Sequence, residues 1–215
     1  MFVLIKKIAE KFDRRVAFRA VCCALVTVLA MSIAGFDAKC DEIRSNVLRL
    51  HILANSDETY DQELKLKVRD RLLTVSTEVF GGCETEEQAV ALAKENINRF
   101  TDEAKNVIIE NGFDYDVTVE VADTVFETRD YEGFSLPAGT YEALRVLIGE
   151  GKGKNWWCVM FPAVCLPAAG DGKSFSGVLS DETAQIVEQP TKYKARFKMV
   201  ELFEKTKSKL SRIFG

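Results

Sequence analysis

The spacing of the apolar residues changes near residue 113, and this change constrains the fold more than any other feature. Before it, apolar side chains recur at helical intervals over residues 57–79 and 85–111, which predicts two amphipathic helices. After it, every second residue of 115–121 is apolar, as in a half-buried strand. We therefore predict an α+β fold: a single domain in which two helices pack on one face of a mostly antiparallel sheet.

Four more strands are predicted at 47–53, 125–128, 141–148 and 156–161. A glycine-rich loop separates the last two, so residues 141–161 are expected to form a hairpin with a long loop. The segment 168–190 reads as a connection. A basic amphipathic helix is predicted from residue 192 to residue 214, and it could lie either on an anionic membrane or on its own domain.

The N-terminus has the composition of a targeting segment. Six basic and two acidic residues in 1–19 precede the uncharged apolar run 20–36, a pattern typical of a signal peptide or a signal anchor. Its 17 residues are at the short end for a membrane span. The positive-inside rule places the leader in the cytoplasm and the body outside. We predict a leader and targeting segment at 1–39, an extracytoplasmic domain at 40–190 and a C-terminal helix at 191–215.

Charge excludes a nucleic-acid binder. From residue 40 onward the chain carries 22 basic and 30 acidic residues, whereas a nucleic-acid interface needs a basic face that displaces counterions.

Few residues could carry catalysis. The single histidine, His51, could serve Cys158 as a base, but Cys158 lies in an apolar run, which raises the pKa of a thiol and blunts it. The glycines at 149, 151 and 153 match neither a dinucleotide nor a phosphate loop, and the cysteine spacing does not suit zinc. We expect no enzyme activity, cofactor, metal or small-molecule substrate. The alternative is an exported cell-envelope hydrolase or another envelope-binding module. A hydrolase would use a carboxylate pair, although no spacing selects one.

Two adjacent tryptophans follow the glycine loop. Neighbouring residues of a strand point to opposite faces, so one ring should be exposed if helices cover only one side. An exposed tryptophan beside a pliable loop suits recognition of a protein partner, whereas the alternative is a flexible hairpin loop. The predicted partner-binding residues are Gly149, Gly151, Lys152, Gly153, Lys154, Asn155, Trp156 and Trp157.

An exported body also predicts a disulfide. Cys158 and Cys165 are seven residues apart, and Pro162 between them can help the chain reverse, as a bridge would require. Two free buried thiols are the alternative. The sequence leaves the redox state of Cys40 and Cys83 open.

Several ordered blocks resemble one known family, the stage II sporulation protein R family of endospore-forming bacteria. The blocks are Leu48–Asp57 (LRLHILANSD), Gln62–Asp70 (QELKLKVRD), Leu136–Val146 (LPAGTYEALRV) and Gly149–Cys165 (GEGKGKNWWCVMFPAVC), and the basic-aromatic tail 193–203 fits too. Ala163 departs from the expected second proline after Pro162.

The resemblance implies a secreted signalling protein. Members of this family are exported across the forespore membrane into the space between the two membranes around the forespore. There they activate a membrane-embedded aspartic protease of the mother cell, stage II sporulation protein GA, which processes the sigma-E precursor. On this reading the chain is a ligand that activates an enzyme, and it contacts the membrane through its N-terminal segment.

Overall fold

The computed structural model describes residues 14–164 and 175–214. The described residues divide between residues 39 and 40 into two compact units. Helix α2 (Arg14–Arg44) makes up the described part of the first unit and continues into the second. Its Val16–Arg44 segment contains an 18-residue window of mean hydropathy 2.2. By length and composition it could cross a membrane, and a signal sequence has the same properties.

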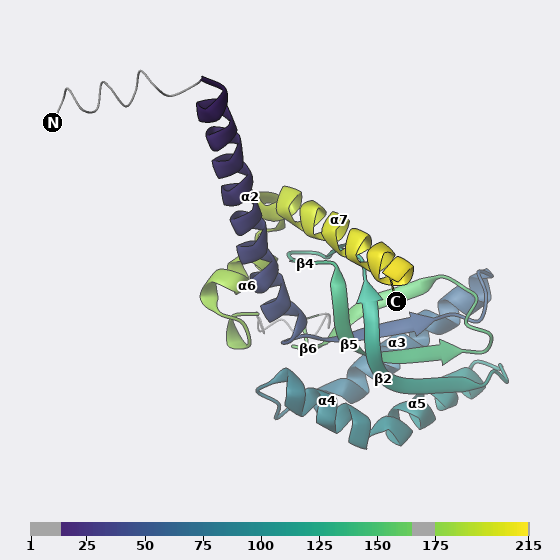
Figure 1. Cartoon of the computed structure of the whole chain (residues 1–215). Helices are drawn as coiled ribbons and strands as arrows, with labels where there is room; N and C mark the ends of the chain where they lie inside the picture. Colours follow the sequence, from purple (N-terminus) through teal and green to yellow (C-terminus); the bar gives the residue numbers. More distant parts are fainter. Residues whose placement is uncertain (1–13, 165–174, 215) are drawn as a thin grey trace. The chain divides into compact units, whose positions relative to one another are not determined.

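The second unit is built on a mixed four-stranded sheet (Figure 1). Its order is β2 (Val117–Phe126), β5 (Gly139–Ile148), β1 (Leu48–Leu53) and β6 (Asn155–Phe161). The β1–β5 pair is parallel, and the β1–β6 and β2–β5 pairs are antiparallel. The α+β class is confirmed, but the predicted 141–161 hairpin is wrong, because β1 lies between β5 and β6.

Three helices pack on one face of this sheet (Figure 1). They are α3 (Thr59–Val79), α4 (Glu86–Glu95) and α5 (Ile97–Glu110). The second of the two predicted helices is thus divided at Asn96, which caps both parts. At the start of α4 the Thr85 side chain accepts a hydrogen bond from the backbone N–H of Gln88, as expected of a capping box.

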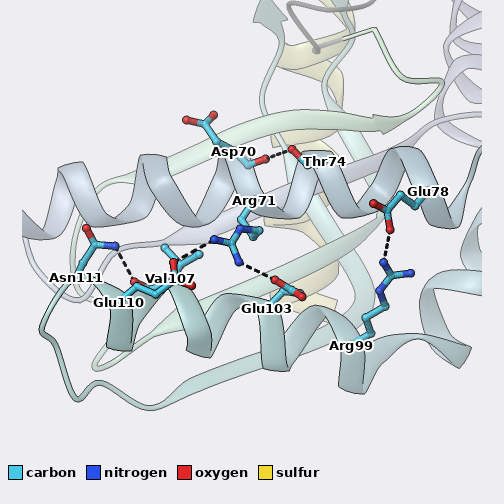
Figure 2. Close-up of polar contacts among 9 residues, drawn as sticks. All are labelled: Asp70, Arg71, Thr74, Glu78, Arg99, Glu103, Val107, Glu110 and Asn111. Atoms are coloured by element: carbon cyan, nitrogen blue, oxygen red, sulfur yellow. Dashed lines mark hydrogen bonds and ion pairs between the residues drawn. The ribbon is translucent and has the colours of Figure 1, made fainter.

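Ion pairs tie α3 to α5 along their exposed edge (Figure 2). Arg71 of α3 donates to Glu103 at 2.8 Å and to Glu110 at 3.0 Å. Glu78 of α3 pairs with Arg99 of α5. Exposed pairs of this kind contribute little stability, about 0–1 kcal/mol each, so the apolar residues beneath them carry most of the packing.

The other face of the sheet is also covered, contrary to the sequence-based expectation. Arg49 of β1 is fully buried there, 4.1 Å from the Phe126 ring centroid and hydrogen-bonded to the Tyr131 hydroxyl at 2.6 Å. Tyr131 stacks on Phe134, and Phe134 contacts Phe175. Phe134 lies between the two strands of a small hairpin, β3 (Arg129–Asp130) and β4 (Ser135–Leu136).

Helices α6 (Asp181–Glu188) and α7 (Pro190–Phe214) complete this second layer. Glu42 holds the start of α6, because its carboxylate accepts hydrogen bonds from the Ser180 amide and the Thr183 hydroxyl. The predicted connection 168–190 therefore includes a helix. Likewise the predicted short strand 125–128 is wrong, since β2 runs on to Phe126 before the chain turns.

Candidate functional site

The glycine loop between β5 and β6 is held by its backbone. The amide N–H groups of six consecutive residues, 149–154, all donate hydrogen bonds of 2.7–3.1 Å. In chain order the acceptors are Asp116 O, Asn55 Oδ1, Ile148 O, Asn55 O, Ala54 O and Asp57 Oδ1. Lys65 adds a bond from its ammonium group to the Lys154 carbonyl at 2.9 Å. The loop is thus fixed to the turn that follows β1.

The glycines serve this close approach. Gly149 and Gly151 have φ of 55° and 60°, values that L side chains rarely adopt. A Cβ added to Gly153 would lie 2.1 Å from the Ser56 carbonyl oxygen. Glycine is therefore needed here for a particular path, and every backbone N–H group along residues 149–154 donates a hydrogen bond.

This path also explains the failed hairpin prediction. Bonds to Ala54 and Asn55 carry the loop across the end of β1. The chain then runs along the edge of β1 that faces away from β5, so β6 pairs with β1 instead of β5.

The two tryptophans face opposite sides of the sheet, as strand alternation predicts. Trp156 packs against the helix-side core, and the Arg69 guanidinium lies 4.4 Å from its ring centroid. Trp157 lies on the other face, where it stacks on His51 and meets Phe126 edge-on at 4.7 Å. Both rings are half-buried. The expectation of one substantially exposed ring is wrong, because Phe126 and Arg69 each cover one of them.

A row of polar and aromatic side chains crosses the sheet on the Trp157 side. Strand pairing places Glu120, Arg145, His51 and Trp157 next to one another on β2, β5, β1 and β6. Arg145 donates to Glu120 at 2.7 Å. His51 Nε2 lies 2.7 Å from Asn155 Oδ1. We call these four residues together with Asn155 the Trp157 surface.

Electrostatics keep the centre of this surface neutral. Burial lowers the pKa of His51 and the nearby cation of Arg145 lowers it further, although the hydrogen bond to Asn155 opposes them. His51 is therefore an uncharged ring at neutral pH, suited to stacking. At the edges, Arg145 and Glu120 remain partly exposed, with side-chain exposures of 37% and 53%.

The two lysines of the glycine loop, Lys152 and Lys154, differ in the charged groups that surround them. Lys152 is 74% exposed and pairs with Glu150 at 2.8 Å, so a neighbouring carboxylate already balances its charge. The Lys154 side chain is exposed. Burial lowers the pKa of Lys65 of α3, and the charge of Lys154 helps to lower it.

The structure separates His51 from Cys158. Cys158 belongs to the helix-side core beside Leu50, whereas His51 points to the opposite face. A His–Cys catalytic pair is therefore excluded. The second cysteine of the expected disulfide, Cys165, lies outside the described residues, so the Cys158–Cys165 bridge stays a prediction.

Sequence reasoning found Trp157 and Asn155 but not their neighbours. His51 and Arg145 carry no local signal of function, since each is a single polar residue between apolar neighbours in its strand. Their alternation with buried residues could have placed them on one face of their own strands. The order of the strands, which brings them beside Trp157, could not be inferred in this way.

Segments that are distant in sequence meet at this site. The turn 54–57 follows β1, Arg69 belongs to α3, Arg145 to β5 and the tryptophans to β6. These are the segments on which the family resemblance rests.

Comparison with known proteins identifies the family. The family profile described as stage II sporulation protein R matches residues 44–170. Stage II sporulation protein R of Bacillus subtilis (strain 168) is 33% identical over 132 residues, covering 61% of this chain and 59% of that protein. The match thus spans less than two thirds of the curated relative. No solved structure matches the chain significantly. With the family profile covering more than half of its residues, the chain belongs to the stage II sporulation protein R family.

Proposed function

We propose that this protein is a secreted signal of endospore formation that activates the membrane-embedded aspartic protease, stage II sporulation protein GA. Family membership supports a signalling role at sporulation stage II, and it is the observation that carries the proposal. The activated protease would then process the sigma-E precursor.

The proposed location is the space between the two membranes around the forespore. The apolar helix α2 supports export, since its length and composition suit a signal peptide or a membrane anchor. The basic leader before it supports a cytoplasmic start and an external body.

We place the protease contact on the predicted residues from Gly149 to Trp157, centred on the Trp157 surface. Binding energy concentrates on tryptophan, tyrosine and arginine side chains held in packed surroundings. Trp157 and Arg145 are such side chains, and Asn155 beside them offers a hydrogen-bonding amide. The glycines would act as scaffold, because their bonded loop fixes Asn155 and both tryptophans before the partner arrives. A preorganised surface loses less conformational entropy on binding.

Activation would follow from a shift of population. A ligand changes the balance between a resting and an active protease only by binding the active state more tightly. Moving a two-state equilibrium from almost fully resting to almost fully active needs about a 10⁴-fold preference. Such a preference is accessible to a contact that includes several strongly contributing side chains.

The test is reconstitution in a non-sporulating bacterium. The full chain, the protease and the sigma-E precursor are co-expressed, and cleavage of the precursor is followed by immunoblotting. We expect cleavage only when all three are present, and none with a protease whose catalytic aspartates are replaced. Cleavage that does not depend on the chain would contradict the proposal. Turnover of cell-wall glycan or peptide by the purified chain would favour the hydrolase alternative.

A further inference from the structure

Helix α7 presents two distinct sides. Its inner side packs on the domain through Phe197 and Val200, which are 2% and 1% exposed. The other side carries large apolar residues that nothing described covers: Met199, Leu202 and Phe203 are 42%, 68% and 49% exposed. Met199 and Leu202 are three residues apart, so they lie one above the other on the helix surface.

Basic residues flank this exposed apolar stripe. At 100° per residue, Lys194, Lys198 and Lys205 project on one side of the stripe, and Arg196 lies beyond Phe203 on the other. Lys192 projects between Met199 and Phe203, two turns nearer the start of the helix. The helix carries eight basic and two acidic residues, in a protein of net charge −4. Glu201, one of the acids, is 12% exposed and already pairs with Lys198 and Lys205.

We propose that this face of α7 docks the protein on an anionic membrane surface. An apolar stripe bordered on both sides by lysine and arginine is typical of helices that lie in the membrane interface. The apolar side chains would enter the boundary of the acyl chains, while the long basic side chains reach the headgroups. Anionic headgroups supply the charge that these residues complement.

Charge also argues against a second copy of the chain as the partner that covers this face of α7. Two copies of this face would bring two strongly basic helices together, and like charges repel. An acidic protein would complement the lysines but gives no reason for three exposed apolar side chains between them. A membrane interface accounts for both features.

The experiment uses the full chain in lipid nanodiscs with a tryptophan reporter, Leu202→Trp. The matched control is Ile109→Trp on α5, where Ile109 is 58% exposed on the helix layer of the opposite sheet face. Quenching by brominated lipid reports contact of the indole with acyl chains. The signal of the parent chain, with Trp156 and Trp157, is subtracted.

We expect brominated phosphatidylglycerol to quench Leu202→Trp about twofold more strongly than brominated phosphatidylcholine does, because anionic lipid is needed for docking. Ile109→Trp should be quenched by neither lipid. Replacing Lys192, Lys194 and Arg196 by glutamine in the Leu202→Trp chain should abolish the difference, and so should about 0.5 M salt, which screens the charges.

Equal quenching of Leu202→Trp and Ile109→Trp would overturn the proposal, as would equal quenching by the two lipids. Concentration-dependent shielding of the Leu202→Trp reporter in lipid-free detergent would show self-association through this face and would overturn it too. Precursor cleavage is not measured, so the outcome is independent of the proposed signalling function.

Discussion

The imidazole of His51 lies flat on the indole of Trp157, with ring centroids 4.0 Å apart and planes inclined by 3°. The two residues are cross-strand partners on β1 and β6. This contact joins the first strand of the domain to the last strand of the sheet, and it positions Trp157 at the centre of the proposed protease contact.

Replacing each tryptophan by alanine should separate folding from signalling. Trp156→Ala removes a ring packed on the helix-side core, so we expect a loss of about 3 kcal/mol in the free energy of unfolding. Trp157→Ala removes stacking on His51 and Phe126, worth about 1–2 kcal/mol in total, and should weaken protease binding by about 2 kcal/mol or more. Urea denaturation and precursor cleavage measure the two effects.

Trp157→Phe is the conservative control for this pair, because it keeps an aromatic ring over His51. It should retain most of the stability and part of the signalling. If Trp157→Ala activates the protease as the parent does, the contact lies elsewhere.

Gly153→Ala should disturb the loop at its tightest point. The added methyl group would meet the Ser56 carbonyl at 2.1 Å, and forcing backbone apart costs about 1–3 kcal/mol. Gly82→Ala is the control, because its methyl group meets nothing within 4 Å. Thermal melting should show a clear drop for Gly153→Ala and almost none for Gly82→Ala. Equal melting temperatures would mean that the loop yields easily.

Glu86 should make stability depend on pH. Burial, together with the nearby Glu142 carboxylate, raises the pKa of Glu86 to about 7. The unfolded chain loses this proton near pH 4.5, so between these values the folded state binds more protons. The free energy of unfolding should therefore fall as pH rises through this window, by roughly 1–3 kcal/mol from this group.

Glu86→Gln should remove this part of the pH dependence and stabilise the protein above neutral pH. Glu95→Gln, at an exposed position of the same helix, is the matched control and should leave the profile unchanged. Urea denaturation between about pH 5 and about pH 8 covers the window. The same change of stability with pH in the parent, Glu86→Gln and Glu95→Gln would contradict the assignment.

Export should fail when charge enters the apolar helix. Arginine at Leu25 and Val28, both exposed on α2, costs about 2.5–3.5 kcal/mol each at the centre of a span. The double variant should stay in the producing cell, as shown by fractionation, and should not signal. The control is the double variant Leu25→Ile with Val28→Ile, which keeps the segment apolar and should be exported normally. Signalling by the arginine variant would refute this route.

The Cys158–Cys165 disulfide is tested by mass spectrometry of exported protein. A bridge closing so short a loop should add about 2–3 kcal/mol to stability. Intact mass with and without reduction, after alkylation, distinguishes a bridge from two thiols. Alkylation of both cysteines without reduction would rule the bridge out.

Local patterns determined much of this protein. Helical spacing predicted α3 and the region of α4 and α5, and alternation predicted β2 and the opposite orientations of Trp156 and Trp157. The apolar run predicted the long helix α2. Each of these features depends on side chains a few residues apart, so the sequence determines them directly.

The tertiary structure alone decided the strand order, the second layer and the neighbours of Trp157. Glu150 and Asn55 are 95 residues apart, yet their hydrogen bond belongs to the set that carries the loop over β1 and separates β5 from β6. Arg49 is buried because Phe126 at the end of β2 and Tyr131 of the β3–β4 hairpin close over it. The spacing of apolar residues along the sequence does not specify which distant backbone groups will form hydrogen bonds with one another. That choice is made by the packing of the whole domain.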